Sequence, residues 1–243
     1  MAHPPITIAI AAVRGMLSGV RRRHSREWIG ALLVQAGIAA ELLEEDNARV
    51  TGEQYVALFT LLMNRLDDEC MGLMSRPLRR GSFVLVARSA LGASTAAVAL
   101  RRIVHGFDLL LPDIAARAVR DGPLTGIALS ARPESGPQQN FSYELLLRVC
   151  WRLLAWLHGG KLMPRRFDFC FDRPYYATIY TKIFPAPLRF GHPDSVVWFD
   201  TADLAVPVRR DAKALHEFLR HSPANVVLPW LVGSVPAEGG MTP

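Results

Sequence analysis

The sequence predicts an α+β fold in which a helical N-terminal half packs on a mostly antiparallel sheet with one buried helix, as a single domain. Apolar residues recur at helical spacing through the first half of the chain, whereas short alternating segments separated by Gly and Pro occupy the second half. Half of the 243 residues are hydrophobic. Such a chain can bury a large core, which excludes disorder as its overall state.

Three main helices are predicted in the first half. Ser25 can cap the first, and Gly37 suits the left-handed position that ends it. Thr51 opens the second, with Gln54 three residues later to complete a capping box. Ser94 can cap the third. Each carries apolar residues at helical spacing on one face, and a short acidic helix at 41–45 lies between the first two.

In the second half, residues 114–120 and 124–132 flank an Asp-Gly-Pro breaker and predict a β-hairpin. The clearest strand is residues 166–172, in which three phenylalanines alternate with polar residues. The remaining predicted elements are a helix at 176–183, strands at 188–190 and 196–199, and a helix at 213–220.

The buried helix is predicted to begin at the cap Ser142 and to end near His158, before two glycines. Apolar residues cover most of its circumference. Glu144, Arg148 and Arg152, one turn apart, leave only a narrow polar stripe. We therefore expect this helix to be buried on most sides and to lie against the sheet.

Charge and cysteine usage narrow the class of protein. The net charge is +6, but only three of the 28 basic residues are lysine, so the charge is weak evidence for nucleic-acid binding. The three cysteines form no C-x-x-C pair, which favours a reducing cytoplasm over a disulfide framework.

The longest apolar run, 83–100, contains Arg88. Near the N-terminus, the basic cluster follows the first apolar stretch instead of preceding it as in a secretory signal. A membrane span and a secretory signal are therefore not expected.

Catalytic motifs are not found in the sequence. His216 and His221 are five residues apart, which places them on different sides of a helix and excludes a shared zinc ion. The acidic run 67–69 lies close to Arg76, Arg79 and Arg80 in sequence, which we interpret as a surface ion-pair network. We expect no enzyme activity, no metal and no cofactor.

A DNA-binding helix-turn-helix at 28–45 is also excluded, because its acidic second helix would repel the phosphates of DNA.

Two segments resemble a known family. The first runs from residue 48 to residue 83 and contains Asp68-Glu69, Gly72-Leu73, Arg76-Pro77-Leu78 and Gly81-Ser82-Phe83. The second starts at Phe167 and contains Phe184-Pro185-x-Pro187-Leu188-x-Phe190-Gly191, then Phe199-Asp200 and Leu204-x-x-Pro207. In order and spacing, most of residues 25–220 resemble the N-terminal effector domain of AraC-type bacterial transcription regulators, in the branch labelled arabinose-binding domain.

The resemblance implies a non-enzymatic sensor that binds a small-molecule effector, forms a homodimer and acts on DNA only through a C-terminal helix-turn-helix domain. We expect that domain to be absent here, because the family places it after a linker beyond residue 220. The expected organisation is an N-terminal segment at 1–24, an effector-binding and dimerisation domain at 25–221, and a Pro/Gly-rich linker or tail at 222–243. The alternative is a ligand-independent dimerisation or protein-interaction module.

A sensor needs a pocket, and ligand pockets are mostly apolar with a few polar anchors. A pocket between the helical half and the sheet is predicted to be lined by the aromatic residues Trp28, Tyr55, Phe59, Phe83 and Trp151. Ordinary core packing is the alternative for each of them. The arginines near the predicted pocket, Arg76, Arg79, Arg80 and Arg88, suit an acidic effector or a solvated face.

Overall fold

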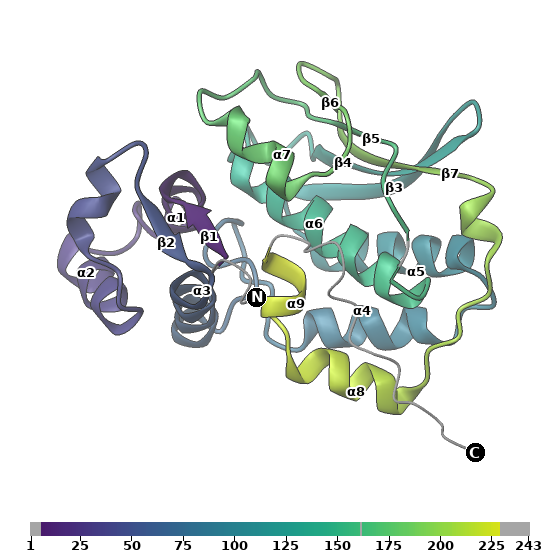
Figure 1. Ribbon diagram of the computed structural model, residues 1–243, viewed down its shortest axis with the longest axis horizontal. Helices are drawn as coiled ribbons and strands as arrows, with labels where there is room; N and C mark the ends of the chain where they lie inside the picture. The colour runs from purple at the N-terminus through teal and green to yellow at the C-terminus, as the bar shows by residue number, and fades with distance from the viewer. Residues whose placement is uncertain (1–5, 161, 229–243) are drawn as a thin grey trace, which may run out of the picture.

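The computed structural model describes residues 6–160 and 162–228. A five-stranded sheet and the helices packed on it form the larger part of the molecule, and a two-stranded sheet lies among the first helices (Figure 1). The predicted α+β fold class is confirmed.

The helices are α1 (Ile10–Leu17), α2 (Arg26–Gln35), α3 (Gly52–Leu66), α4 (Ser82–Leu91), α5 (Ala96–Leu110), α6 (Asn140–Leu157), α7 (Tyr180–Ile183), α8 (Ala212–Arg220) and α9 (Ala224–Val227), with 3₁₀ turns at Ala40–Glu44, Ala177–Ile179 and Asp203–Ala205. The strands are β1 (Thr7–Ala9), β2 (Arg49–Thr51), β3 (Ile114–Asp121), β4 (Leu124–Ala131), β5 (Arg166–Asp168), β6 (Leu188–Arg189) and β7 (Ser195–Asp200).

The large sheet has the order β3-β4-β7-β5-β6 and is antiparallel except for the β5–β6 pair. The predicted hairpin is confirmed as β3 and β4, with Asp121 opposite Leu124. Its turn uses Gly122 at a φ of 54°, a left-handed conformation that glycine adopts without steric cost. Because β4 pairs with β7, the hairpin is joined to strands from the last third of the chain.

Helix α6 packs against β4 and β7 of the large sheet and against the helices α1, α5 and α9 (Figure 1), and 14 of its 18 residues are buried. On the sheet side, Trp151 packs edge-on against Phe167 of β5 with ring centroids 5.7 Å apart. Phe167 and Phe169 continue this aromatic layer toward Phe184 after α7. The expectation of a helix buried on most sides against the sheet is therefore confirmed.

Helix α6 starts earlier than its sequence suggested. It begins at Asn140, so Ser142 is not its cap but a fully buried residue inside the first turn. The third helix of the first half is capped by Thr95, whose side chain accepts from the Val98 amide, one residue after the expected Ser94. Strand β5 ends at Asp168 rather than at residue 172, because the Cys170 amide donates to the Ser195 hydroxyl and leaves the ladder.

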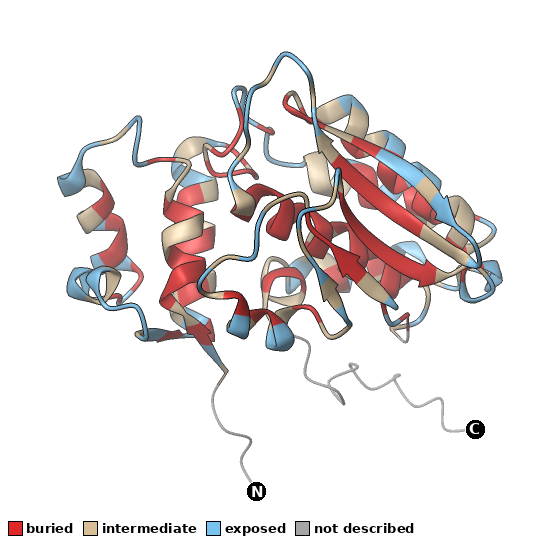
Figure 2. Ribbon diagram, turned by 90° about the horizontal axis from the view of Figure 1, so that it is seen from above, coloured by how far each residue is buried: buried red, intermediate tan, exposed pale blue. Residues whose placement is uncertain are grey.

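The first residues differ most from expectation. Residues 6–24 were expected to precede the domain, yet β1 pairs with β2 and α1 buries Ile10, Val13 and Met16 in the common core. A strand of three residues has little sequence signal of its own, since its partner is about 40 residues away. Figure 2 shows the buried residues continuing from α3 into the sheet.

The described part of the linker or tail expected from residue 222 packs against the domain. Residues 222–228, called here the C-terminal segment, include α9, and Val226 and Val227 are buried against α6. Arg148 and Arg152 of α6 donate to the carbonyls of Val227 and Asn225, which fixes the segment to the domain. Residues 229–243 lie outside the described residues.

The capping box that begins α3 gives the first prediction. Thr51 accepts from the Gln54 amide at 3.1 Å, and the Gln54 side chain accepts from the Thr51 amide at 2.8 Å. Thr51→Ala removes one acceptor, so the free energy of unfolding should fall by about 1 kcal/mol and the melting temperature by roughly 2–4 °C. Thr51→Ser keeps the hydroxyl and should melt close to wild type. Equal losses in both variants would contradict the capping role.

Candidate functional site

The loop between α3 and α4 is fixed by two acidic side chains. Asp68 is 2% exposed and accepts from the amides of Cys70, Gly72 and Leu78 at 2.7–2.9 Å. These bonds fold the loop back on itself, since each buried amide needs an acceptor.

Glu69 continues the same arrangement at the start of α4. Its two oxygens accept from the amides of Gly81 at 2.7 Å and Phe83 at 2.8 Å. These amides belong to the first turn of the helix, where backbone donors have no partner within the helix. The acidic run interpreted as an ion-pair network is thus mainly a set of backbone acceptors. Only Asp67 forms an ion pair there, with Arg79 at 2.6 Å.

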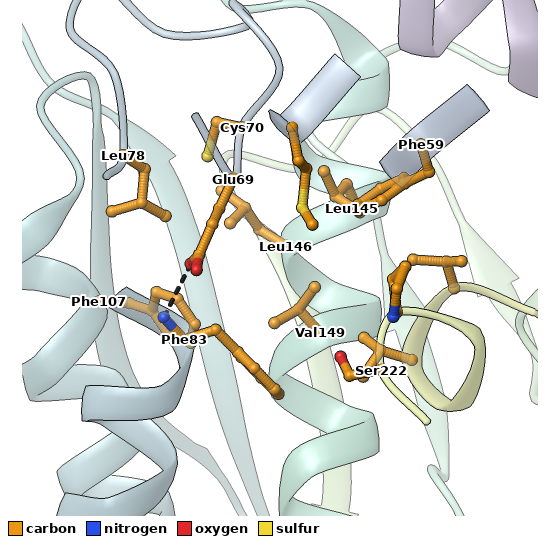
Figure 3. Close-up of a pocket in the computed structure, with 14 residues that line it drawn as sticks. Phe59, Glu69, Cys70, Leu78, Phe83, Phe107, Leu145, Leu146, Val149 and Ser222 are labelled. Carbon is orange, nitrogen blue, oxygen red and sulfur yellow. Dashed lines mark hydrogen bonds between the residues drawn. The ribbon is translucent and has the colours of Figure 1, made fainter. Parts of the chain in front are cut away.

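A cavity of about 90 Å³ lies behind this loop. Its walls come from α3, the loop, α4, α5 and α6, and Figure 3 shows these side chains converging on one space. They are mostly apolar: Phe59, Met63, Leu78, Phe83, Phe107, Leu145, Leu146 and Val149.

The C-terminal segment completes the cavity. Ser222, Pro223, Val226 and Val227 line the side that the helical half and the loop leave open. The cavity is therefore bounded by the first half of the chain, by the central helix α6 and by the last described residues at once.

Few polar groups face this cavity. Among the described residues that line it, the polar side chains are Glu69, Cys70 and Ser222, and none is Lys, Arg or His. Burial raises the pKa of Glu69, against the opposing effect of its two amide bonds. Burial also raises the pKa of the Cys70 thiol well above its ordinary value, so this thiol is neutral and a poor nucleophile. Glu69 and Cys70 are thus the titratable side chains in an otherwise mostly apolar lining.

The polar stripe of α6 is itself buried, beside the cavity. Glu144 is 6% exposed and accepts from the hydroxyls of Tyr180 and Tyr176. Arg148 is 5% exposed and its Nη1 donates to the Val227 carbonyl at 3.1 Å. Arg152 donates from Nε and Nη2 to the Asn225 carbonyl at 3.0 and 2.6 Å. Burial and the Arg148 charge lower the pKa of Arg152 to about 10.

Two of the five aromatic residues predicted for a pocket, Phe59 and Phe83, line the cavity. The other three lie elsewhere. Tyr55 is fully buried beside Arg148, and Trp151 packs on the sheet with its Nε1 donating to the Leu162 carbonyl at 3.1 Å. Trp28 stacks on His24 with centroids 4.0 Å apart, on the outer helix α2. The structure thus brings only Phe59 and Phe83 together.

The four arginines considered for an acidic effector do not line the cavity, although the charge of Arg80 acts on Glu69 in its wall. Arg76, Arg79, Arg80 and Arg88 are exposed, and Arg79 is paired with Asp67. The lining residues that the sequence missed include the aliphatic residues of α6, the Glu69 loop and the C-terminal segment, which was assigned to a linker or tail. For the C-terminal segment, the apolar run Val226-Val227-Leu228, which begins three residues after Pro223, was the available signal.

Within residues 6–160 and 162–228, no three metal-ligating side chains come together. Every helix in this part of the chain is too short or too polar to cross a membrane.

These observations define a one-domain α+β protein with a mostly apolar cavity between its helices and its last described residues. The chain belongs to the family described as the arabinose-binding domain of AraC transcription regulators, N-terminal, whose model matches residues 29–208. The matched residues include the Asp68-Glu69 loop, α6 and the whole large sheet.

Among solved structures, the chain is similar to the crystal structure of the transcriptional regulator CdpR from Pseudomonas aeruginosa, with 17% identity and a TM-score of 0.45. The match covers 79% of this chain and 60% of that chain, so this chain spans less than two thirds of the longer protein. Among curated proteins, no match is found.

The buried carboxyl of Glu144 gives a prediction on pH. Burial raises its pKa in the folded protein above the ordinary value near 4.3. The stability that this group contributes is complete below the ordinary pKa and is lost as pH rises through the folded pKa. The free energy of unfolding of wild type should therefore fall relative to that of Glu144→Gln as pH rises from about 4.

Urea unfolding of both proteins between pH 4 and pH 8 measures this difference. Glu134→Gln, in an exposed loop, is the matched control and should leave the pH profile unchanged. A constant difference between wild type and Glu144→Gln across this range would contradict the assignment.

Proposed function

We propose that this chain is the effector-sensing domain of a cytoplasmic bacterial AraC-type regulator, and that it binds a small molecule in the cavity between α3, α4, α5, α6 and the C-terminal segment. The cavity carries the proposal, because it joins the two halves of the fold and is lined almost entirely by apolar side chains. Family membership supports a regulatory role.

The size of the cavity limits what fits without a rearrangement. Its volume is about 90 Å³, whereas a buried apolar cavity of about 150 Å³ admits benzene. A small ligand therefore fits the cavity without a change in the structure. A larger effector needs one wall to move, and the wall with the least secondary structure is the C-terminal segment, whose helix α9 has four residues.

This wall also connects the cavity to the remainder of a regulator. Val226 and Val227 face the cavity, while the carbonyls of Asn225 and Val227 accept from Arg152 and Arg148. In the family, the DNA-binding domain follows this part of the chain. An effector that favours one position of α9 would thus shift the population of two arrangements of the regulator. A shift from 1:99 to 99:1 requires about 5.5 kcal/mol of differential affinity.

The regulator would act on DNA through its C-terminal domain, as a homodimer.

One observation favours the alternative, a ligand-independent dimerisation or interaction module. Leu85 and Leu109, on the neighbouring helices α4 and α5, are 61% and 67% exposed. Sedimentation with and without a stabilising ligand separates the two functions, since the alternative requires a dimer that no ligand changes.

Thermal unfolding with a library of small metabolites tests ligand binding. A compound at 100 times its Kd adds about 2.7 kcal/mol to the free energy of unfolding, which raises the melting temperature by roughly 5–10 °C. Val149→Phe fills the cavity and should abolish this shift, whereas Val34→Phe, on the exposed face of α2, should preserve it. If the library contains no stabilising compound, or if Val149→Phe responds like wild type, the sensing proposal fails.

The attachment of α9 gives a further prediction. Arg148→Met removes a buried donor to the Val227 carbonyl, so local opening of the C-terminal segment should become easier. Amide hydrogen exchange at Val226, Val227 and Leu228 should accelerate about tenfold, equivalent to about 1.4 kcal/mol. The exposed Arg21→Met is the control. Unchanged exchange in Arg148→Met would show that this bond does not hold the segment.

A further inference from the structure

We infer that the cavity selects an apolar molecule whose single polar group is a hydrogen-bond donor, a primary amine or a hydroxyl, and that it rejects the corresponding carboxylic acid. The inference rests on the proposed function, because it names the class of ligand for the same cavity. The determining residue is Glu69.

Glu69 presents acceptors to the cavity. Figure 3 shows its carboxylate directed along the cavity wall toward the start of α4. One oxygen accepts from the Gly81 amide and the other from the Phe83 amide, one bond each. A carboxylate oxygen can accept two hydrogen bonds, so each oxygen retains capacity for a donor. The two amides also hold the carboxylate in place, so a ligand would meet an acceptor of fixed orientation.

The remaining wall offers no cation. Cys70 and Ser222 are the other polar side chains among the described lining residues, and the rest are apolar. An ammonium or hydroxyl entering this space exchanges water for the Glu69 oxygens. A carboxylate loses its water, meets no cationic side chain in the lining and lies against a second carboxylate, which the charge of Arg80 outside the wall already stabilises.

Burial of Glu69 also favours a ligand that donates a hydrogen bond. Desolvation raises the pKa of this carboxyl, which means that its ionised form is poorly stabilised in the empty cavity. A donor from a ligand supplies the stabilisation that water would otherwise provide.

The test uses three probes with the same body: n-butylamine, butan-1-ol and butyrate, at equal ionic strength. Titrations of wild type are followed by NMR of the Val and Leu methyl groups, of which Leu146, Val149 and Val226 line the cavity. The amine and the alcohol should shift these methyls and bind at least tenfold more tightly than butyrate. Butyrate binding as tightly as the amine at the same methyls would overturn the inference and leave the cavity a ligand site. Binding of none of the three would overturn the cavity proposal as well.

Two variants assign the selectivity. Glu69→Gln removes the negative charge and should reduce the discrimination against butyrate to less than threefold. Ser222→Ala, which changes another polar group of the wall, should keep the tenfold discrimination. Discrimination that persists in Glu69→Gln overturns the role of Glu69. If circular dichroism shows that Glu69→Gln is unfolded, Glu69→Asp, which keeps the charge but shortens its reach, replaces it and should weaken amine binding at least threefold.

Discussion

Helix α6 places polar side chains in the interior of the fold, and the surrounding elements supply their hydrogen-bond partners. Glu144 and Arg148 are each about 95% buried between the sheet and the other helices. A buried polar group costs free energy unless it has hydrogen-bond partners. The tyrosines of residues 176 and 180 supply donors for Glu144, and the carbonyls of the C-terminal segment supply acceptors for Arg148 and Arg152. The segment after α8 therefore returns to α6, and in returning it forms one wall of the apolar cavity.

Much of the fold could be predicted because its signals are local. The capping box of Thr51 and Gln54, the Gly122 turn and the glycines that end α6 each specify a structure within a few residues. The parts that were missed depend on distant partners. Strand β1 has three residues and is a strand only because β2 pairs with it. Ser142 looked like a cap because the sequence does not show that Asn140 already begins the helix. The composition after residue 222 suggested a linker, but buried arginines on α6 hold α9 in place.

The candidate site was less predictable than the fold. The aromatic residues were predicted to line a pocket because they lie on buried faces. Phe59 and Phe83 line the cavity, whereas Trp151 and Tyr55 fill the core and Trp28 stacks on His24 at an outer helix. A hydrophobic pattern identifies which face of an element is buried. It does not show whether that face lines a cavity or packs tightly against its neighbours. For the same reason, the sequence showed the charges of Asp68 and Glu69 without showing which backbone amides they would meet. Their contribution to the site depends on the loop geometry alone.

The central claim is that the helical half, α6 and the C-terminal segment together line one apolar space. Crystals of this chain under xenon pressure test it most directly, since xenon enters dry apolar cavities that water leaves empty. The account predicts a xenon peak bounded by Phe83, Val149 and Val226. Side chains that fill this position, or α9 lying away from α6, would contradict it.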